Sequence, residues 1–171
     1  MRNIFFIGAL AVGCAKSQPA TVTVQQQEVP AWAMSSIKGC GVGIQKLGVD
    51  LGLTRDAAVA SGRADLARSL KTTVHGVIQD YVQEGSVDGA SFSEELVTST
   101  VQDVVNMTLM GTQIKKSNAI GDQFYALVCI DVATFSNTFT TQEKLPQVHR
   151  EGLRKRAADA FKELDAEIDK L

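Results

Sequence analysis

The sequence contains few of the residues that mark common functional classes. Its 171 residues include two histidines, three cysteines and one tryptophan, and aromatic residues make up only 6%. Basic and acidic residues nearly balance, at 17 and 19, so no positive field attracts nucleic acid. Arginine and aromatic residues do not interleave as they do in proteins that stack single-stranded bases. The sequence therefore predicts no nucleic-acid partner.

The sequence also lacks the groupings that metal binding or catalysis requires. His75 and His149 have no cysteine or carboxylate at ligand spacing, whereas a zinc site needs three or four ligands. Glu94 and Glu95 are adjacent at an expected helix start, where carboxylates favour the helix dipole. No nucleophile-elbow or cysteine–histidine signature occurs. We predict that the chain is not an enzyme and binds no cofactor or metal.

No apolar run at the start of the chain is long enough to span a bilayer. Ten uncharged residues, 4–13, follow a short lead that carries Arg2. A membrane helix needs about 20 apolar residues, but ten suit the hydrophobic region of a secretory signal. The run ends in Ala11-Val12-Gly13-Cys14, which resembles a bacterial lipobox. The resemblance implies a signal peptide over 1–13 and acylation of Cys14; a buried N-terminal strand is the alternative.

The segment after Cys14 is typical of a flexible tether. Residues 14–29 are rich in Ala, Ser, Thr, Gln and Val and show no clear periodicity. Ala15, rather than an aspartate, follows the cysteine. By resemblance to known sorting rules, this implies a lipid anchor on the periplasmic face of the outer membrane of a Gram-negative cell.

Once Cys14 is acylated, Cys40 and Cys129 remain. An oxidising periplasm permits a disulfide between them. Both cysteines fall in expected strands, and a free cysteine often behaves as a small buried apolar residue. We expect two buried thiols, with a disulfide as the alternative.

A glycine-rich strand is expected to open the folded domain, over Ser36 to Leu47. Gly39, Gly41 and Gly43 share one face, which indicates a close backbone approach there. A phosphate-binding loop is the rival interpretation, but the next glycine of that motif is missing.

A long helix is expected to follow, over Thr54 to Glu84 with Thr54 as its N-cap. Its inner stripe begins with small residues and continues with larger ones, namely Ala57, Ala60, Ala64, Ala67, Val74, Ile78 and Tyr81. We predict that its alanine face packs on the glycine face of the strand.

The remaining elements complete an α+β pattern. After a break over 85–89, Ser91 and Glu94 form a capping-box pattern at the start of a second helix, with a strand as the alternative for 97–105. A hairpin is expected from Met110 to Ala119 and Gln123 to Thr134, followed by a polar linker, 138–147. A final helix, His149 to Leu171, carries an apolar stripe that suits core packing first and a coiled-coil seam second.

We therefore expect an α+β domain over 30–138, with a linker and C-terminal helix over 139–171. The fold predicted is a small, three-stranded, mainly antiparallel sheet packed by the long helix and the second helix. The stripe of the C-terminal helix is expected to exceed what this sheet can cover.

Several motifs in order resemble a known family. Gly39-Cys40-Gly41-Val42-Gly43 precedes an alanine-studded helix, and Leu109-Met110-Gly111-Thr112-Gln113-Ile114 and Gln123-Phe124-Tyr125-Ala126-Leu127-Val128 follow. From about Pro30 to Val132, the chain resembles the twenty-kilodalton outer-membrane lipoprotein family of Gram-negative bacteria. Within that family it is most similar to flagellar basal-disk lipoproteins of the FlgP type. The family has no recognised catalytic residues.

The resemblance implies a structural role. We expect a lipoprotein, anchored through the lipid on Cys14, that self-assembles into a ring or disk around the flagellar motor and is needed for motility. Its expected partners are copies of itself, the outer membrane, and other flagellar motor or envelope proteins. The alternative is a monomeric or dimeric lipoprotein that binds cell wall, lipid or another envelope protein.

Overall fold

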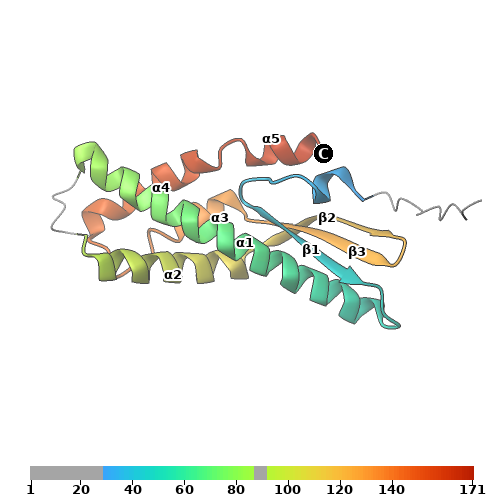
Figure 1. Cartoon of the computed structure of the whole chain (residues 1–171). Helices are drawn as coiled ribbons and strands as arrows, with labels where there is room; N and C mark the ends of the chain where they lie inside the picture. Colours follow the sequence, from blue (N-terminus) through green and yellow to red (C-terminus); the bar gives the residue numbers. More distant parts are fainter. Residues whose placement is uncertain (1–28, 87–91) are drawn as a thin grey trace, which may run out of the picture.

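The computed structural model describes residues 29–86 and 92–171 and confirms the α+β fold (Figure 1). The predicted signal peptide, Cys14, nearly all of the tether and Ser91 lie outside the described residues. The helices are η1 (Ala31–Ala33), α1 (Leu51–Tyr81), η2 (Val82–Ser86), α2 (Glu94–Met110), α3 (Val132–Asn137), α4 (Gln147–Ala160) and α5 (Leu164–Asp169). The strands are β1 (Cys40–Lys46), β2 (Gln113–Ile120) and β3 (Gln123–Cys129).

The three strands form an antiparallel sheet in the order β1-β3-β2. The central strand is β3, whose nearly continuous apolar sequence suits burial on both faces, as expected. The predicted hairpin forms, with Gly121 at positive φ in its turn. The predicted extension of its second strand to Thr134 is wrong. Asp131 accepts a hydrogen bond from the Thr134 N–H at 2.7 Å and so starts α3 instead.

The long helix α1 begins earlier than the sequence indicates. Its N-cap is Asp50, whose carboxylate accepts from the N–H groups of Gly52 at 2.8 Å and Leu53 at 3.1 Å. The predicted cap, Thr54, lies inside the first turn, where its hydroxyl donates to the Asp50 carbonyl at 2.9 Å. The correction follows from the position of Asp50, whose carboxylate reaches two otherwise unpaired donors.

Gly41 and Gly43 of β1 pack against α1, as predicted, but through different helix residues. The third predicted member of this face, Gly39, instead lies before the strand and faces Phe161 and Leu164. A Cβ atom on Gly41 would overlap the backbone of Gly62 and Leu66, and one on Gly43 would overlap that of Ala58. The predicted contact residues Ala57, Ala60 and Ala64 are exposed, and Ala67 is only half-buried. The correction has a packing cause: this helix rotation also buries Leu66 and Leu70, which have more apolar surface than alanine to remove from water.

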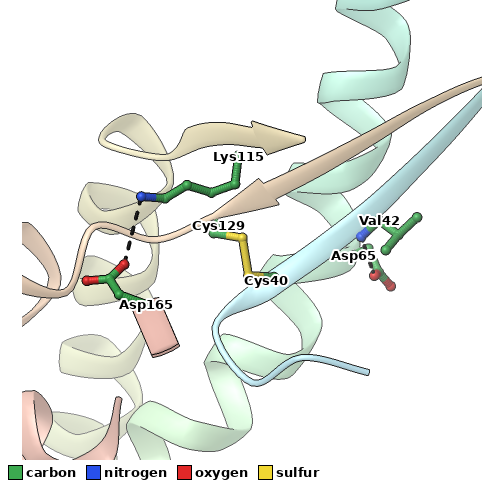
Figure 2. Close-up of a disulfide and its surroundings, with 6 residues drawn as sticks. All are labelled: Cys40, Val42, Asp65, Lys115, Cys129 and Asp165. Carbon is green, nitrogen blue, oxygen red and sulfur yellow. Dashed lines mark hydrogen bonds and ion pairs between the residues drawn. A yellow bond between two sulfur atoms is a disulfide. The ribbon is translucent and has the colours of Figure 1, made fainter. Parts of the chain in front are cut away.

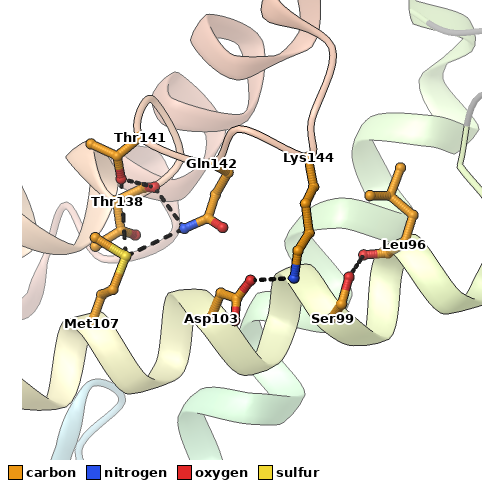
Figure 3. Close-up of polar contacts among 8 residues, drawn as sticks. All are labelled: Leu96, Ser99, Asp103, Met107, Thr138, Thr141, Gln142 and Lys144. Atoms are coloured by element: carbon orange, nitrogen blue, oxygen red, sulfur yellow. Dashed lines mark hydrogen bonds and ion pairs between the residues drawn. The ribbon is translucent and has the colours of Figure 1, made fainter.

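The second helix, α2, is confirmed, and the strand alternative for 97–105 is excluded. Its N-cap is Ser93, which accepts from the Leu96 N–H at 3.2 Å. Beside it, the predicted linker is an integral part of the fold (Figure 3). Phe139 and Leu145 are completely buried, and Lys144 Nζ contacts the Asp103 carboxylate of α2 at 2.9 Å. The segment therefore belongs to the main core.

The predicted C-terminal helix is two helices, because the chain turns at Phe161 between α4 and α5. The turn places Phe161 against Phe135, with ring centroids 5.0 Å apart, and both Phe161 and Leu164 against Gly39. The apolar stripe is buried in the core, at Leu153, Ala157, Phe161, Leu164 and Ile168. The expectation of a surplus apolar stripe is therefore wrong.

Candidate functional site

The one predicted site residue, the lipidation candidate Cys14, lies outside the described residues, so no geometry bears on it. Three other features of the structure bear on function: a disulfide, the unequal edges of the sheet, and exposed apolar residues around the start of α1.

Cys40 and Cys129 form a disulfide between β1 and β3 (Figure 2). The two residues are directly opposite in the strand register, with their Cα atoms 4.0 Å apart. The expectation of two free thiols is therefore wrong, although both residues are buried as expected. The error has a specific cause: composition identifies two buried cysteines, but only the strand register makes them partners. Disulfides are typical of exported proteins and rare in the cytosol.

The outer edge of β1 is partly closed by local contacts. The Val42 N–H donates to the Asp65 carboxylate of α1 at 3.1 Å (Figure 2). The Cys40 N–H donates to the Ile37 carbonyl at 3.0 Å. Arg68 in turn contacts Asp65 at 2.7 Å and holds the carboxylate in place. The first half of this edge is therefore protected against pairing with another chain.

The outer edge of β2 is open. In an antiparallel ladder, successive residues direct their backbone groups to opposite sides. Because Val42 directs its N–H away from β3, its partner Leu127 directs its backbone toward β2, where it pairs with Lys116. Ser117, the next residue, then directs its backbone groups outward, as does Ala119. No further strand pairs with β2 among residues 29–86 and 92–171.

Positive charge and a backbone irregularity modify the β2 edge without covering it. The register shifts between Ile114 and Lys116, which leaves Lys115 in a bulge. Lys115 Nζ lies 3.9 Å from the Asp165 carboxylate of α5 (Figure 2). A bulge and lysines are devices that limit indiscriminate edge pairing. The side chains of Ser117 and Ala119, beyond the bulge, are exposed.

Three large aliphatic residues lie around the start of α1, and we call them the apolar tip: Val49 in the β1–α1 loop, and Leu51 and Leu53 in the first turn of the helix. Val49 is fully exposed, and Leu51 and Leu53 are 66% and 69% exposed. Asp50 lies between them, but its carboxylate is occupied by backbone donors of the helix start. The tip lies at the end of the molecule where the described chain begins, near the turn of the β2–β3 hairpin (Figure 1).

The two histidines have different surroundings. His149 is buried, with its Nδ1 atom 3.3 Å from the Tyr81 hydroxyl and its ring 5.5 Å from that of Phe92. His75 is exposed and borders a cavity of about 350 Å³ between α1 and α2, together with Glu94. No group of three His, Cys, Asp or Glu residues that could hold a metal occurs in the described part of the chain.

Two carboxylates at element ends have perturbed acidity. A hydrogen bond from the Thr134 backbone lowers the pKa of Asp131 below its ordinary value. Hydrogen bonds from Arg156 lower the pKa of Glu84, which lies just after α1. Arg156 also lies over the Tyr81 ring, 5.9 Å from its centroid. The Asp131 carboxylate therefore acts as an N-cap of α3, and the Glu84–Arg156 ion pair links the segment after α1 to α4.

No helix in the described part of the chain combines the length and the apolar character needed to cross a membrane. No protein-family model matches the chain, and no curated protein is similar enough to be called a relative.

Proposed function

We propose that this protein is an outer-membrane lipoprotein, anchored through Cys14, that self-assembles into a ring or disk. In this proposal its role is structural. The assembly is the basal disk around the flagellar motor, and the protein is needed for motility. The proposal combines the lipobox-like sequence with two features of the fold.

The Cys40–Cys129 disulfide supports export. Glutathione and thioredoxin keep most cytosolic thiols reduced, whereas the periplasm permits disulfides to form and persist. This bond joins the first and last strands of the domain and closes a span of 89 residues. A fold that uses such a bond suits the compartment to which a signal peptide would deliver it.

The open edge of β2 is the observation that carries the assembly proposal. An edge strand offers a row of unpaired backbone donors and acceptors that can pair with another chain. The first half of the β1 edge is shielded by Asp65 and Ile37, so the two edges are not equivalent. A contact between different surfaces of neighbouring subunits repeats head to tail and closes into a ring when its rotation allows. Anchoring on one membrane raises the local concentration of subunits and aligns them.

The flagellar assignment rests on the family resemblance alone. The motif order from Pro30 to Val132 is the basis of that resemblance. A deletion strain tests it: loss of swimming with intact flagellar filaments is expected, and full motility would contradict the assignment.

The assembly itself is tested on the full-length lipidated protein, extracted in mild detergent and imaged by electron microscopy. Discrete large rings or disks are expected. Particles no larger than a dimer at high concentration would favour the alternative, an envelope lipoprotein that binds cell wall, lipid or another protein. Fractionation of cells with Cys14→Ser tests the anchor. Release from the membrane fraction is expected, and a mature protein that still begins at Met1 would contradict lipidation.

A further inference from the structure

We infer that the apolar tip, Val49, Leu51 and Leu53, inserts into the lipid bilayer that carries the anchor and fixes the orientation of the domain. The inference rests on the proposed lipid anchor at Cys14. It adds a second, non-covalent membrane contact, made by a folded part of the chain.

The first support is the cost of leaving the tip in water. These three side chains expose most of their surface, although the same fold buries other leucines completely, Leu66 among them. Burying one leucine side chain changes a partition constant by at least about tenfold. Exposed apolar clusters rimmed by polar residues mark interaction sites. The rim is present, because exposed Lys46 and Arg55 precede and follow the tip.

The second support is the length of chain between the tip and the anchor. Fourteen residues lie between Cys14 and Val29, where the described structure begins, and the fifteen steps from Cys14 to Val29 span at most about 54 Å when fully extended. The helix α1 alone, with 31 residues, is about 46 Å long. The described chain begins at the same end of the molecule as the tip (Figure 1). The tip is therefore within reach of the bilayer at any tether length, whereas the opposite end can reach it only when the tether is almost fully extended.

The third support is the shape and size of the tip. It is the end of a helix with three exposed aliphatic side chains, whereas a stable protein interface buries about 800 Å² on each partner. A second copy would need a matching pocket for these residues. A bilayer needs none, since acyl chains and headgroups adapt to a small apolar protrusion. The charge of Asp50 is no obstacle at headgroup depth, because helix N–H groups bind its carboxylate.

Fluorescence quenching by brominated lipid tests the inference. The full-length lipidated protein is reconstituted into vesicles of phosphatidylethanolamine and phosphatidylglycerol, with or without bromine on the acyl chains. Leu51→Trp adds a reporter at the tip. Val148→Trp is the matched control, because Val148 is 77% exposed and lies in the first turn of α4, which begins at the opposite end of the molecule (Figure 1). The parent, with Trp32 alone, gives the baseline.

Brominated vesicles should quench most of the fluorescence added by Leu51→Trp and leave that added by Val148→Trp nearly unchanged. Equal quenching of the two reporters in an acylated, vesicle-bound protein would overturn the inference and leave the anchor intact. A change in the Leu51→Trp fluorescence that is the same with and without bromine, and that grows with the protein-to-lipid ratio, would also overturn it. That result would indicate contact with a second copy of the protein. Absence of acyl mass on Cys14 would overturn the anchor and this inference together.

Discussion

Gly43 on β1 lies directly against Ala58 on α1, so that a Cβ atom at position 43 would occupy the space of the Ala58 carbonyl oxygen. Gly41 makes the same close approach to Gly62 one turn further along the helix. Two backbones therefore meet where most sheet–helix contacts are made by side chains. This contact sets the position of α1 on the sheet.

Gly43→Ala should destabilise the fold, because the obstructing atoms belong to backbone that cannot rotate away. We expect a loss of about 3 kcal/mol, at the upper end of the overpacking range. Gly76→Ala is the matched control: no atom lies within 4 Å of a Cβ there, and alanine in mid-helix is favoured by about 1 kcal/mol. Urea unfolding of both variants measures the difference. Equal stability of the two variants would disprove the close contact.

Removal of the disulfide should weaken the domain substantially. Cys40→Ser with Cys129→Ser removes a bond across 89 residues that limits the conformations of the unfolded chain. Its removal should lower the free energy of unfolding by about 4 kcal/mol. Unfolding in oxidising and reducing buffer measures the effect. The parent should lose stability on reduction, and the double variant should be insensitive to the reductant. If alkylation without a reductant adds two alkyl groups to the mass of the parent, Cys40 and Cys129 are free thiols and the bond does not form.

Acid should selectively remove the contribution of the Asp131 cap. Because the folded-state pKa of Asp131 is lowered, its ionised form stabilises the fold above the unfolded carboxyl value, and this stabilisation is lost as pH falls through the folded value. At pH 7, Asp131→Ala should cost about 1 kcal/mol. The difference in free energy of unfolding between the parent and the variant should become smaller below about pH 4. A difference that stays constant from pH 7 to pH 3 would show that the ionised carboxylate contributes nothing.

The C-terminal helices should prove essential to the fold rather than dispensable. Leu153 is fully buried in the main core, so Leu153→Ala should cost about 2–5 kcal/mol. Val148→Ala in the same helix removes an exposed side chain and should stay within about 0.5 kcal/mol. Deletion of 149–171 should likewise unfold the domain. If the truncated chain still melts cooperatively at the parent temperature, this part of the core is not needed.

The sequence predicted the elements better than their contacts. Alternating glycines indicated the close approach on β1, and the apolar run around Leu127 indicated a central strand. The rotation of α1 about its own axis was not predictable from the small residues, because Ala64 and Gly62 suit a tight contact with the sheet equally well. The burial of Leu66 and Leu70 decides which of the two faces the sheet. The disulfide was missed because it depends on the register of β1 against β3.

The candidate site was predicted less well than the fold. Cys14 follows from local sequence alone, but the open edge of β2 and the apolar tip depend on tertiary structure. Leu51 and Leu53 flank Gly52 at the start of an otherwise regular helix, and their exposure follows from the packing of α1, which contacts the β1 glycines only from Ala58 onward. The apolar pattern of α4 suggested surplus surface because the extent of the core beneath it was not visible in the sequence.

The measurement that tests the central claim most directly is the particle mass of the full-length lipidated protein and its Ser117→Pro variant in detergent. Ser117 directs its N–H to the open edge of β2, so proline removes a donor for a neighbour without breaking the ladder to β3. Asn118→Pro is the control, because Asn118 directs its backbone groups toward its partner Tyr125 on β3. Loss of the Asn118 N–H should therefore weaken the fold of the monomer itself. We predict a large discrete assembly for the parent and a folded, dissociated Ser117→Pro variant. A monomeric parent, or a Ser117→Pro variant that still forms the parent's assembly, would contradict the account.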